Sequence, residues 1–316
     1  MKILLFANTD WYLYNFRLPL AQAIKAQGHE VVCISPPGAY GSRLEAAGCR
    51  WLPLPMERRS LNPWTEARLL QHLIALYHRE RPDLAHHFTL KCVAYGALAA
   101  RATGVSTVNA ITGLGHVFTA YNFRTRLLQP PIRSLLRFCL RGLNSRLILQ
   151  NPDDRQEFLA QHLICADHIR LIPGSGVNTQ RFRPRAGPRQ PGAFRVLLAT
   201  RLLWDKGVGE YAEAARQLHR EGLPIEFRLA GDPDPGNPTS VPQETIEEWQ
   251  QQGLLTVLGH VGAMEPLLAD TDLMILPSYR EGTPRSLLEA AACGLPIITT
   301  DAIGCREVVE HGVNGL

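Results

Sequence analysis

The chain has 316 residues, of which 45% are hydrophobic and 20% charged, values typical of a globular protein with room for two domains. No apolar run is long enough to span a bilayer, and the apolar start at residues 1–6 is too short for a secretory signal. The seven cysteines lack metal-ligand spacing, which favours reduced thiols and a cytoplasmic location. Charge is uneven: residues 1–177 contain 20 Lys and Arg against 11 Asp and Glu, whereas residues 178–316 contain 13 against 18.

Short β-rich segments alternate with helix-length segments through the first half of the chain. The expected strands are 3–7, 30–35, 84–88, 105–111, 146–150 and 169–173, and helices are expected over 18–27 and 64–79. This alternation predicts a parallel sheet covered by helices on both faces.

Residues 178–192 are rich in Pro, Gly and Arg and predict a linker between two domains, 1–177 and 193–316. After the linker the alternation restarts, with strands expected at 194–200, 225–230, 255–258, 273–276 and 296–300 and a helix over 207–221. We therefore expect an α/β protein of two doubly wound, Rossmann-like domains that face a cleft at the carboxyl ends of their strands. The chain stops at a turn with no closing helix, so the second domain is expected to be incomplete.

The segment 121–152 contains no acidic residue. Pro130 and Pro131 predict a helix start, because proline is tolerated at the first helical position. One face of this helix carries Arg133, Arg137 and Arg141, and another carries Leu135, Leu136, Cys139, Leu140 and Leu143. A basic amphipathic helix is typical of proteins that lie on anionic membranes. The alternative is a helix packed on its leucine face with solvated arginines. Nucleic acid is not expected as a partner, because stacking aromatics are missing between the arginines.

Two glutamates flank a predicted strand-to-helix turn in the second half. Glu281 falls in the loop after an apolar strand, and Glu289 falls about one turn into the following helix. A helix N-terminus presents unpaired N–H groups and a positive dipole end, which bind anions. A nucleotide sugar would fit, with its diphosphate on backbone amides and its hydroxyls on the glutamates. The alternative is an acidic first turn with one buried glutamate.

Two cations stand at another strand end in the same half. Arg201 follows a strand directly, and Lys206 lies just before the next expected helix. Such a pair can neutralise a diphosphate and stabilise it as a leaving group. The alternative is a loop arginine and a surface lysine. Asp232-Pro233-Asp234 is expected to form a turn, so no metal site is predicted.

Two histidine-containing segments follow expected strands in the first half. Gly113-Leu114-Gly115-His116 lacks the third glycine of a dinucleotide fingerprint and predicts a loop. There His116 either faces the cleft in a catalytic role or has no role. His86 and His87 end a strand, and one of them must point into the packing because neighbours alternate faces. Without acidic partners at ligand spacing, they do not predict a metal site.

These segments resemble a known family. The spacing of Glu281 and Glu289 resembles the Glu-x7-Glu signature of family-4 retaining glycosyltransferases, which have the two-domain GT-B fold. Arg201 and Lys206 stand where that family has its phosphate-binding Arg and Lys. Segments 10–17, 60–63 and 113–115 are similar to a narrower group. That group comprises bacterial transferases that extend undecaprenyl-diphosphate-linked sugars, among them N-acetylgalactosaminyltransferases and enzymes of O-antigen and capsule assembly.

The resemblance implies metal-independent, retaining transfer of a hexosyl or N-acetylhexosaminyl group from a nucleotide sugar, with a UDP-sugar favoured. The acceptor would be a polyprenyl-diphosphate-linked glycan bound by the first domain, at the inner face of the cytoplasmic membrane. No cofactor is implied besides the donor. The alternatives are an epimerase or hydrolase of nucleotide sugars on the same fold, or a binding protein without catalysis.

The resemblance also implies roles for individual residues. Glu281 would contact the donor sugar and Glu289 the ribose, while Arg201 and Lys206 hold the diphosphate. Further donor contacts are implied for Gly282, Thr283, Ser286 and Leu287, and for His260 and Val261 beside the base.

Overall fold

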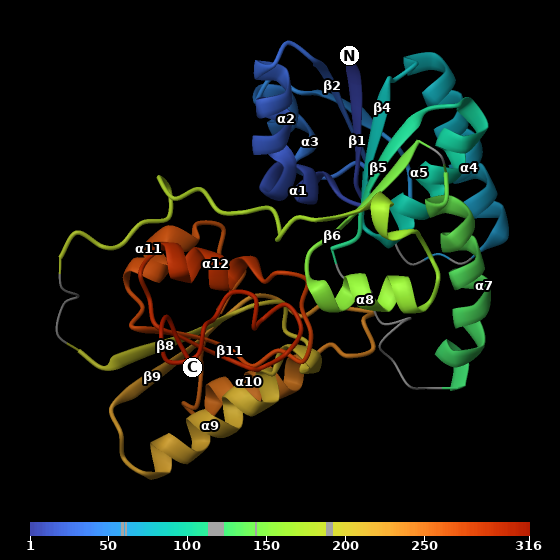
Figure 1. Ribbon diagram of the computed structural model, residues 1–316. Helices are drawn as coiled ribbons and strands as arrows, with labels where there is room; N and C mark the ends of the chain where they lie inside the picture. Colours follow the sequence, from blue (N-terminus) through green and yellow to red (C-terminus); the bar gives the residue numbers. More distant parts are fainter. Residues whose placement is uncertain (58–59, 61, 113–122, 143, 188–191) are drawn as a thin grey trace. The chain divides into compact units, whose positions relative to one another are not determined.

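The computed structural model describes residues 1–57, 60, 62–112, 123–142, 144–187 and 192–316. The chain divides into two compact units, Met1–Ser175 and Gly176–Leu316, each built on one parallel sheet (Figure 1).

The first unit contains a seven-stranded parallel sheet in the order β3-β2-β1-β4-β5-β6-β7. Its strands are β1 (Lys2–Phe6), β2 (Glu30–Ser35), β3 (Arg50–Pro53), β4 (Leu84–Phe88), β5 (Ser106–Ala110), β6 (Ser145–Leu149) and β7 (Ile169–Leu171). The order runs outward in both directions from β1 and β4, as in a doubly wound fold. All six strands expected in this half are present. β3 was not expected, because its sequence Arg-Trp-Leu-Pro is short and ends in proline.

Helices cover both faces of this sheet. They are α1 (Asp10–Tyr12), a π-helical turn (Leu13–Arg17), α2 (Leu18–Ala26), α3 (Gly41–Ala46), α4 (Pro63–Glu80), α5 (Leu90–Thr103), α7 (Phe123–Leu140), α8 (Pro152–Ala160) and a 3₁₀ turn (Ala166–His168). Leu4 and Leu5 are both fully buried, but in different cores. Leu4 packs with α4 residues and Leu5 with residues of α2 and α3. The continuous apolar run of β1 is therefore explained by burial on both sides.

Helix α7 differs from its prediction. It begins at Phe123, so that Pro130 and Pro131, expected to start it, lie inside it. Leu136, Cys139 and Leu140 are buried as expected, whereas Leu135 is exposed. Leu143 lies outside the described residues. None of the described helices is both long and apolar enough to cross a membrane.

Two arginines of the basic face of α7 hold the end of a neighbouring helix. Arg137 donates to the carbonyl oxygens of Gln161 and His162 at 3.0 and 3.1 Å, and Arg141 donates to His162 at 2.7 Å. These carbonyls follow α8, so the arginines complete hydrogen bonds that its C-terminus leaves open. The side chains remain exposed.

The second unit contains a five-stranded parallel sheet in the order β10-β9-β8-β11-β12. Its elements are β8 (Phe194–Ala199), a 3₁₀ turn (Trp204–Lys206), α9 (Val208–Arg220), β9 (Ile225–Ala230), α10 (Gln243–Gln251), β10 (Thr256–Gly259), α11 (Met264–Ala269), β11 (Leu273–Leu276), α12 (Arg285–Ala292) and β12 (Ile297–Thr299). All five expected strands form. Part of the expected linker packs on this unit, because Phe182 belongs to its core and Arg181 pairs with Glu265.

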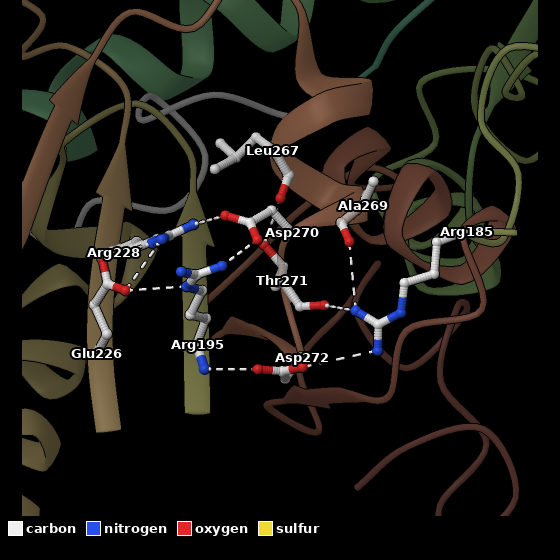
Figure 2. Close-up of polar contacts among 9 residues, drawn as sticks. All are labelled: Arg185, Arg195, Glu226, Arg228, Leu267, Ala269, Asp270, Thr271 and Asp272. Atoms are coloured by element: carbon white, nitrogen blue, oxygen red, sulfur yellow. Dashed lines mark hydrogen bonds and ion pairs between the residues drawn. The ribbon is translucent and has the colours of Figure 1, made fainter. Parts of the chain in front are cut away.

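An ion-pair network joins the amino ends of three neighbouring strands of this sheet (Figure 2). Arg195 of β8 and Arg228 of β9 both contact Glu226 of β9 and Asp270, which precedes β11. Asp272 accepts the backbone N–H of Arg195 at 2.9 Å. A hydrogen bond from Arg228, followed by opposing burial and by the charges of both arginines, keeps the pKa of Glu226 below its ordinary value.

We predict that Glu226→Gln lowers the free energy of unfolding at pH 7 by roughly 1–2 kcal/mol, the value of a partly exposed charge-assisted hydrogen bond. Folding lowers the pKa of Glu226. The stabilisation that its carboxylate gives to the folded state is therefore complete above the unfolded-state pKa, and it is lost as the pH falls through the folded-state pKa. The difference between wild type and variant in urea titrations should therefore shrink toward acid pH. Glu213→Gln, which removes an exposed helix pair, is the control. A pH-independent difference would contradict the prediction.

Candidate functional site

The candidate residues of the second unit come together at the carboxyl edge of its sheet. Arg201 follows β8, and Glu281 follows β11, the strand paired with β8. His260 follows β10. Glu281 lies in the loop before α12, and Glu289 lies on that helix, as expected. Ligands of doubly wound sheets bind at this edge.

Lys206 and Glu281 form an ion pair at the centre of the site. The Lys206 ammonium lies 2.7 Å from Oε1 of Glu281 and donates to the carbonyl of Arg280 at 3.3 Å. Lys206 is only 8% exposed, so the prediction of a cation built into the site is favoured over a surface lysine. A buried lysine is stable only with a partner, and Glu281 provides it.

The loops that carry this pair are bonded to each other. Asp205 accepts from the backbone N–H of Tyr279 at 3.0 Å and from the hydroxyl of Ser278 at 3.2 Å, both through its backbone carbonyl. Gly207 ends the 3₁₀ turn with φ +75°, and a Cβ there would lie 2.2 Å from the carbonyl oxygen of Pro277. Only glycine therefore allows the two loops to approach so closely.

A third segment, residues 303–304, contacts the loop of Glu281. The backbone N–H of Glu281 donates to the carbonyl of Ile303 at 2.9 Å. Gly304 has φ +84°, and a Cβ there would lie 2.4 Å from the carbonyl oxygen of Glu281. The position of Glu281 therefore depends on a glycine far away in the sequence.

The start of α12 offers hydrogen-bond donors to a ligand. Pro284 precedes the helix without a side-chain capping bond, and the amide of Leu288 is bonded back to Pro284 at 3.3 Å. Within the described part of the chain, the amides of Ser286 and Leu287 have no acceptor, and the buried Oγ1 of Thr283 has no partner. Such an N-terminus binds anions.

Glu289 is buried on α12, with 8% of its surface exposed. Its Oε1 lies 2.8 Å from Nε of Arg285, one turn earlier. Burial raises the pKa of Glu289, although the charge and hydrogen bond of Arg285 and the charge of Arg181 oppose this. Hydroxyl groups that donate to the carboxylate would stabilise its charged form.

Arg201 and His260 lie on the exposed side of the site. Arg201 donates to Asp234 at 3.1 Å, and 58% of its side chain is exposed. His260 lies 4.0 Å from Asp232, with both side chains exposed. Val261 packs on the core. Across the described residues no three His, Cys, Asp or Glu side chains gather as metal ligands.

Sequence reasoning placed some residues and missed others. It singled out Glu281, Glu289, Arg201 and Lys206 as candidates. It did not single out Asp205 and Gly304, whose contacts position these loops, because the sequence carries no local signal for them. Asp234 was noted only as part of a turn, although it is the partner of Arg201. His116 lies outside the described residues.

Gly304→Ala should displace the loop of Glu281. A left-handed backbone costs an alanine about 1–2 kcal/mol, and Gly312→Ala measures that term alone, because Gly312 has φ +77° and no atom within 4 Å. We expect Gly304→Ala to lower the free energy of unfolding of the second unit by about 1–3 kcal/mol more than Gly312→Ala, since its Cβ also overlaps the backbone. Equal losses in urea titrations would show that the contact is unimportant.

Comparisons with known proteins agree with this geometry. Residues 2–151 match the family described as glycosyl transferase 4-like, and residues 193–316 match glycosyl transferases group 1. The N,N'-diacetylbacillosaminyl-diphospho-undecaprenol alpha-1,3-N-acetylgalactosaminyltransferase of Campylobacter jejuni is 27% identical, over 100% of this chain and 85% of the relative. The UDP-Gal:alpha-D-GlcNAc-diphosphoundecaprenol alpha-1,3-galactosyltransferase of Escherichia coli is 24% identical, over 83% of this chain and 69% of the relative.

Solved structures share the fold. The crystal structure of Anabaena Alr3699/HepE in complex with UDP-glucose has a TM-score of 0.77 at 21% identity, covering 100% of this chain and 85% of that one. WaaG, a glycosyltransferase involved in lipopolysaccharide biosynthesis, has a TM-score of 0.70 at 16% identity, covering 97% and 83%. The expected fold class, GT-B with two Rossmann-type sheets, is confirmed. The family matches over both units show that this chain is a glycosyltransferase with a 4-like domain over residues 2–151 and a group 1 domain over residues 193–316.

Proposed function

We propose that this glycosyltransferase moves a sugar from a UDP-sugar to a polyprenyl-diphosphate-linked glycan, with retention of configuration and without a metal. The observation that carries the proposal is the ion pair between buried Lys206 and half-buried Glu281, beside the open N-terminus of α12. The acceptor class is supported by the Campylobacter and Escherichia coli relatives, whose names both specify a diphospho-undecaprenol substrate. The base is supported by the Escherichia coli enzyme and by HepE, which bind UDP-linked sugars.

The donor would be bound by N–H groups that face its phosphates and by carboxylates that face its hydroxyls. Lys206 has three N–H bonds, of which Glu281 and the carbonyl of Arg280 occupy two, so the third can donate to a phosphate oxygen. Arg201 would leave its ion pair with Asp234 and contact the same diphosphate instead. Amides of Ser286 and Leu287 would add neutral donors. Glu281 would accept from sugar hydroxyls and Glu289 from ribose hydroxyls.

This arrangement stabilises a leaving diphosphate. As the bond from the sugar to the phosphate oxygen breaks, negative charge grows on that oxygen, where Lys206 and Arg201 would compensate it. The same oxygen can take the proton of the acceptor hydroxyl that attacks on the same face. Residues 1–177 would bind the acceptor, residues 178–192 would link the units, and residues 193–316 would bind the donor. An epimerase or hydrolase, by contrast, would consume donor without acceptor.

Lys206→Ala and Arg201→Ala should each raise the barrier to transfer by about 2–4 kcal/mol, roughly 30- to 1,000-fold in turnover, because each removes a charged contact to the leaving group. Turnover is measured as UDP release that requires acceptor, and folding by circular dichroism. Lys206→Met keeps the buried stem if alanine destabilises the loop. Arg216→Ala removes a surface arginine as the control. Near-normal turnover in both site variants would overturn the leaving-group role.

The membrane-facing element of this proposal is α7, at the inner face of the cytoplasmic membrane. Leu135 and Phe138 are exposed on it, and exposed Arg137 and Arg141 accompany them without a carboxylate partner in the described residues. Apolar side chains beside uncompensated cations suit an anionic lipid surface. Arg137 and Arg141 also donate to the carbonyls at the end of α8, so their removal would affect folding as well as membrane binding. We therefore mutate the apolar pair, Leu135 and Phe138, to test membrane binding.

The double variant Leu135→Ser, Phe138→Ser should bind vesicles of phosphatidylcholine and phosphatidylglycerol at least about fivefold more weakly, because less apolar surface enters the interface. Sedimentation with the vesicles measures the affinity. Leu223→Ser, at another exposed leucine, is the control. Equal vesicle binding by the wild type and the double variant would exclude α7 as the docking element.

A further inference from the structure

A second cluster of basic side chains lies at the carboxyl edge of the first sheet. The Arg17 guanidinium lies 4.3 Å from the ring centroid of Phe88, and the ring of His86 packs on the same Phe88 at 4.1 Å. Phe88 is the last residue of β4 and His86 lies two residues before it; β4 pairs with β1 where the strand order reverses. That reversal is where doubly wound sheets bind ligands.

Both basic residues leave hydrogen-bonding capacity unused. Arg17 donates to the hydroxyl of Tyr12 at 2.7 Å, but its Nε is buried without a partner, as is Nε2 of His86. No carboxylate among the described residues pairs with Arg17. Buried polar groups nearly always have partners, so Nε of Arg17 and Nε2 of His86, both beside the Phe88 ring, can each bond to a ligand. Both residues keep part of their surface exposed, which leaves access for a ligand.

The nearest acidic residue in the sequence does not fill this role. Asp10 is buried, and its carboxylate accepts the backbone N–H groups of Trp11, Tyr40 and Gly41 at 2.7–2.9 Å. It therefore holds the first turn of α3 instead of neutralising Arg17.

The surroundings of His86 disfavour its charged form. Burial, then the charges of Arg17 and His87, lower the pKa of His86 to about 3. His87 faces the opposite side of the sheet, bonded to Tyr77 and Asn109, and burial lowers its pKa to about 4. Both imidazoles are thus neutral at pH 7. A bound anion would oppose these effects and raise the pKa of His86.

The backbone is unusual on either side of the cluster. Arg17 ends the π-helical turn Leu13–Arg17, a rare conformation that is frequent at functional sites. Thr89, directly after Phe88, has φ +73°, which is rare for a β-branched residue. Strain of this kind is concentrated at binding and catalytic sites.

We propose that Arg17 and His86 bind the diphosphate of the polyprenyl-diphosphate-linked acceptor. This inference rests on the proposed function for the identity of the acceptor. A guanidinium matches two phosphate oxygens at once, and its position over the Phe88 ring holds it in place. The imidazole adds an N–H donor beside it. Free phosphate shares this chemistry, so the experiment must separate it from a lipid headgroup.

The kinetic test is Arg17→Gln in the full chain. We expect the KM for the lipid-linked acceptor to rise at least about tenfold, the loss of a charge-assisted contact, with the KM for the UDP-sugar unchanged. Arg43→Gln is the matched control, because Arg43 also stacks on an aromatic ring, that of Tyr40 at 4.8 Å. Arg17→Lys, which keeps the charge, replaces Arg17→Gln if the latter does not fold. An unchanged acceptor KM would overturn the proposal while leaving the transfer reaction intact.

The binding test follows the His86 ring signals of the wild-type protein by NMR through a pH titration. Geranyl diphosphate should raise the pKa of His86, and geraniol should leave it unchanged. Pyrophosphate that binds as tightly as geranyl diphosphate would identify a free-phosphate site and overturn the lipid assignment. An unchanged His86 with every diphosphate would overturn the anion site itself. Absence of transfer to any lipid-linked acceptor, with His86 still responding, would instead contradict the proposed function.

Discussion

The ion pair between Lys206 and Glu281 is the constraint on which the proposed donor site depends. A lysine that is 8% exposed requires a nearby charge, and Glu281 provides it at 2.7 Å. The pair holds the loop after β8 against the loop after β11, and Gly207 and Gly304 permit the close backbone approach that this needs. The glutamate of the family signature is thus placed by its neighbours before any ligand arrives. The lysine in turn keeps one N–H for a phosphate.

Each unit carries cations at the carboxyl edge of its sheet whose environment favours an added anion. In the second unit Lys206 and Arg201 stand beside the open start of α12. In the first unit Arg17 lies on Phe88 with no carboxylate partner among the described residues. A transferase that moves a sugar from a nucleoside diphosphate to a lipid diphosphate acceptor has to bind two such anions. The charge distribution of each unit, taken by itself, is consistent with that requirement.

The sequence predicted most of the strands, and the loop and helix that carry Glu281 and Glu289, because these depend on local signals. Apolar runs bounded by turns identified eleven of the strands described here, and the spacing of Glu281 and Glu289 located the loop and helix that carry them. β3 was missed because a four-residue edge strand that ends in proline has little local signal. The predicted start of α7 at Pro130 and Pro131 is wrong, because the helix begins at Phe123 and both prolines lie inside it.

Contacts between segments that are far apart in the sequence could not be predicted, because no local pattern indicates them. Gly304 supports Glu281 from a distant segment, and Arg201 meets Asp234 across a loop. For His86 the sequence predicts only that it and His87 lie on opposite faces of a strand. That alternation is correct, since His87 packs toward Tyr77, but it could not show that His86 would meet Arg17 on one aromatic ring.

The central claim is that the second unit binds a nucleoside diphosphate through α12 and Glu289. Calorimetric titration with UDP, GDP, ADP and NAD, beside a Glu289→Ala variant, tests it most directly. The account predicts saturable binding of UDP in preference to the others, weakened in the variant because the ribose hydroxyls lose their acceptor. Absence of binding by any of them, or binding that Glu289→Ala leaves unchanged, would contradict it.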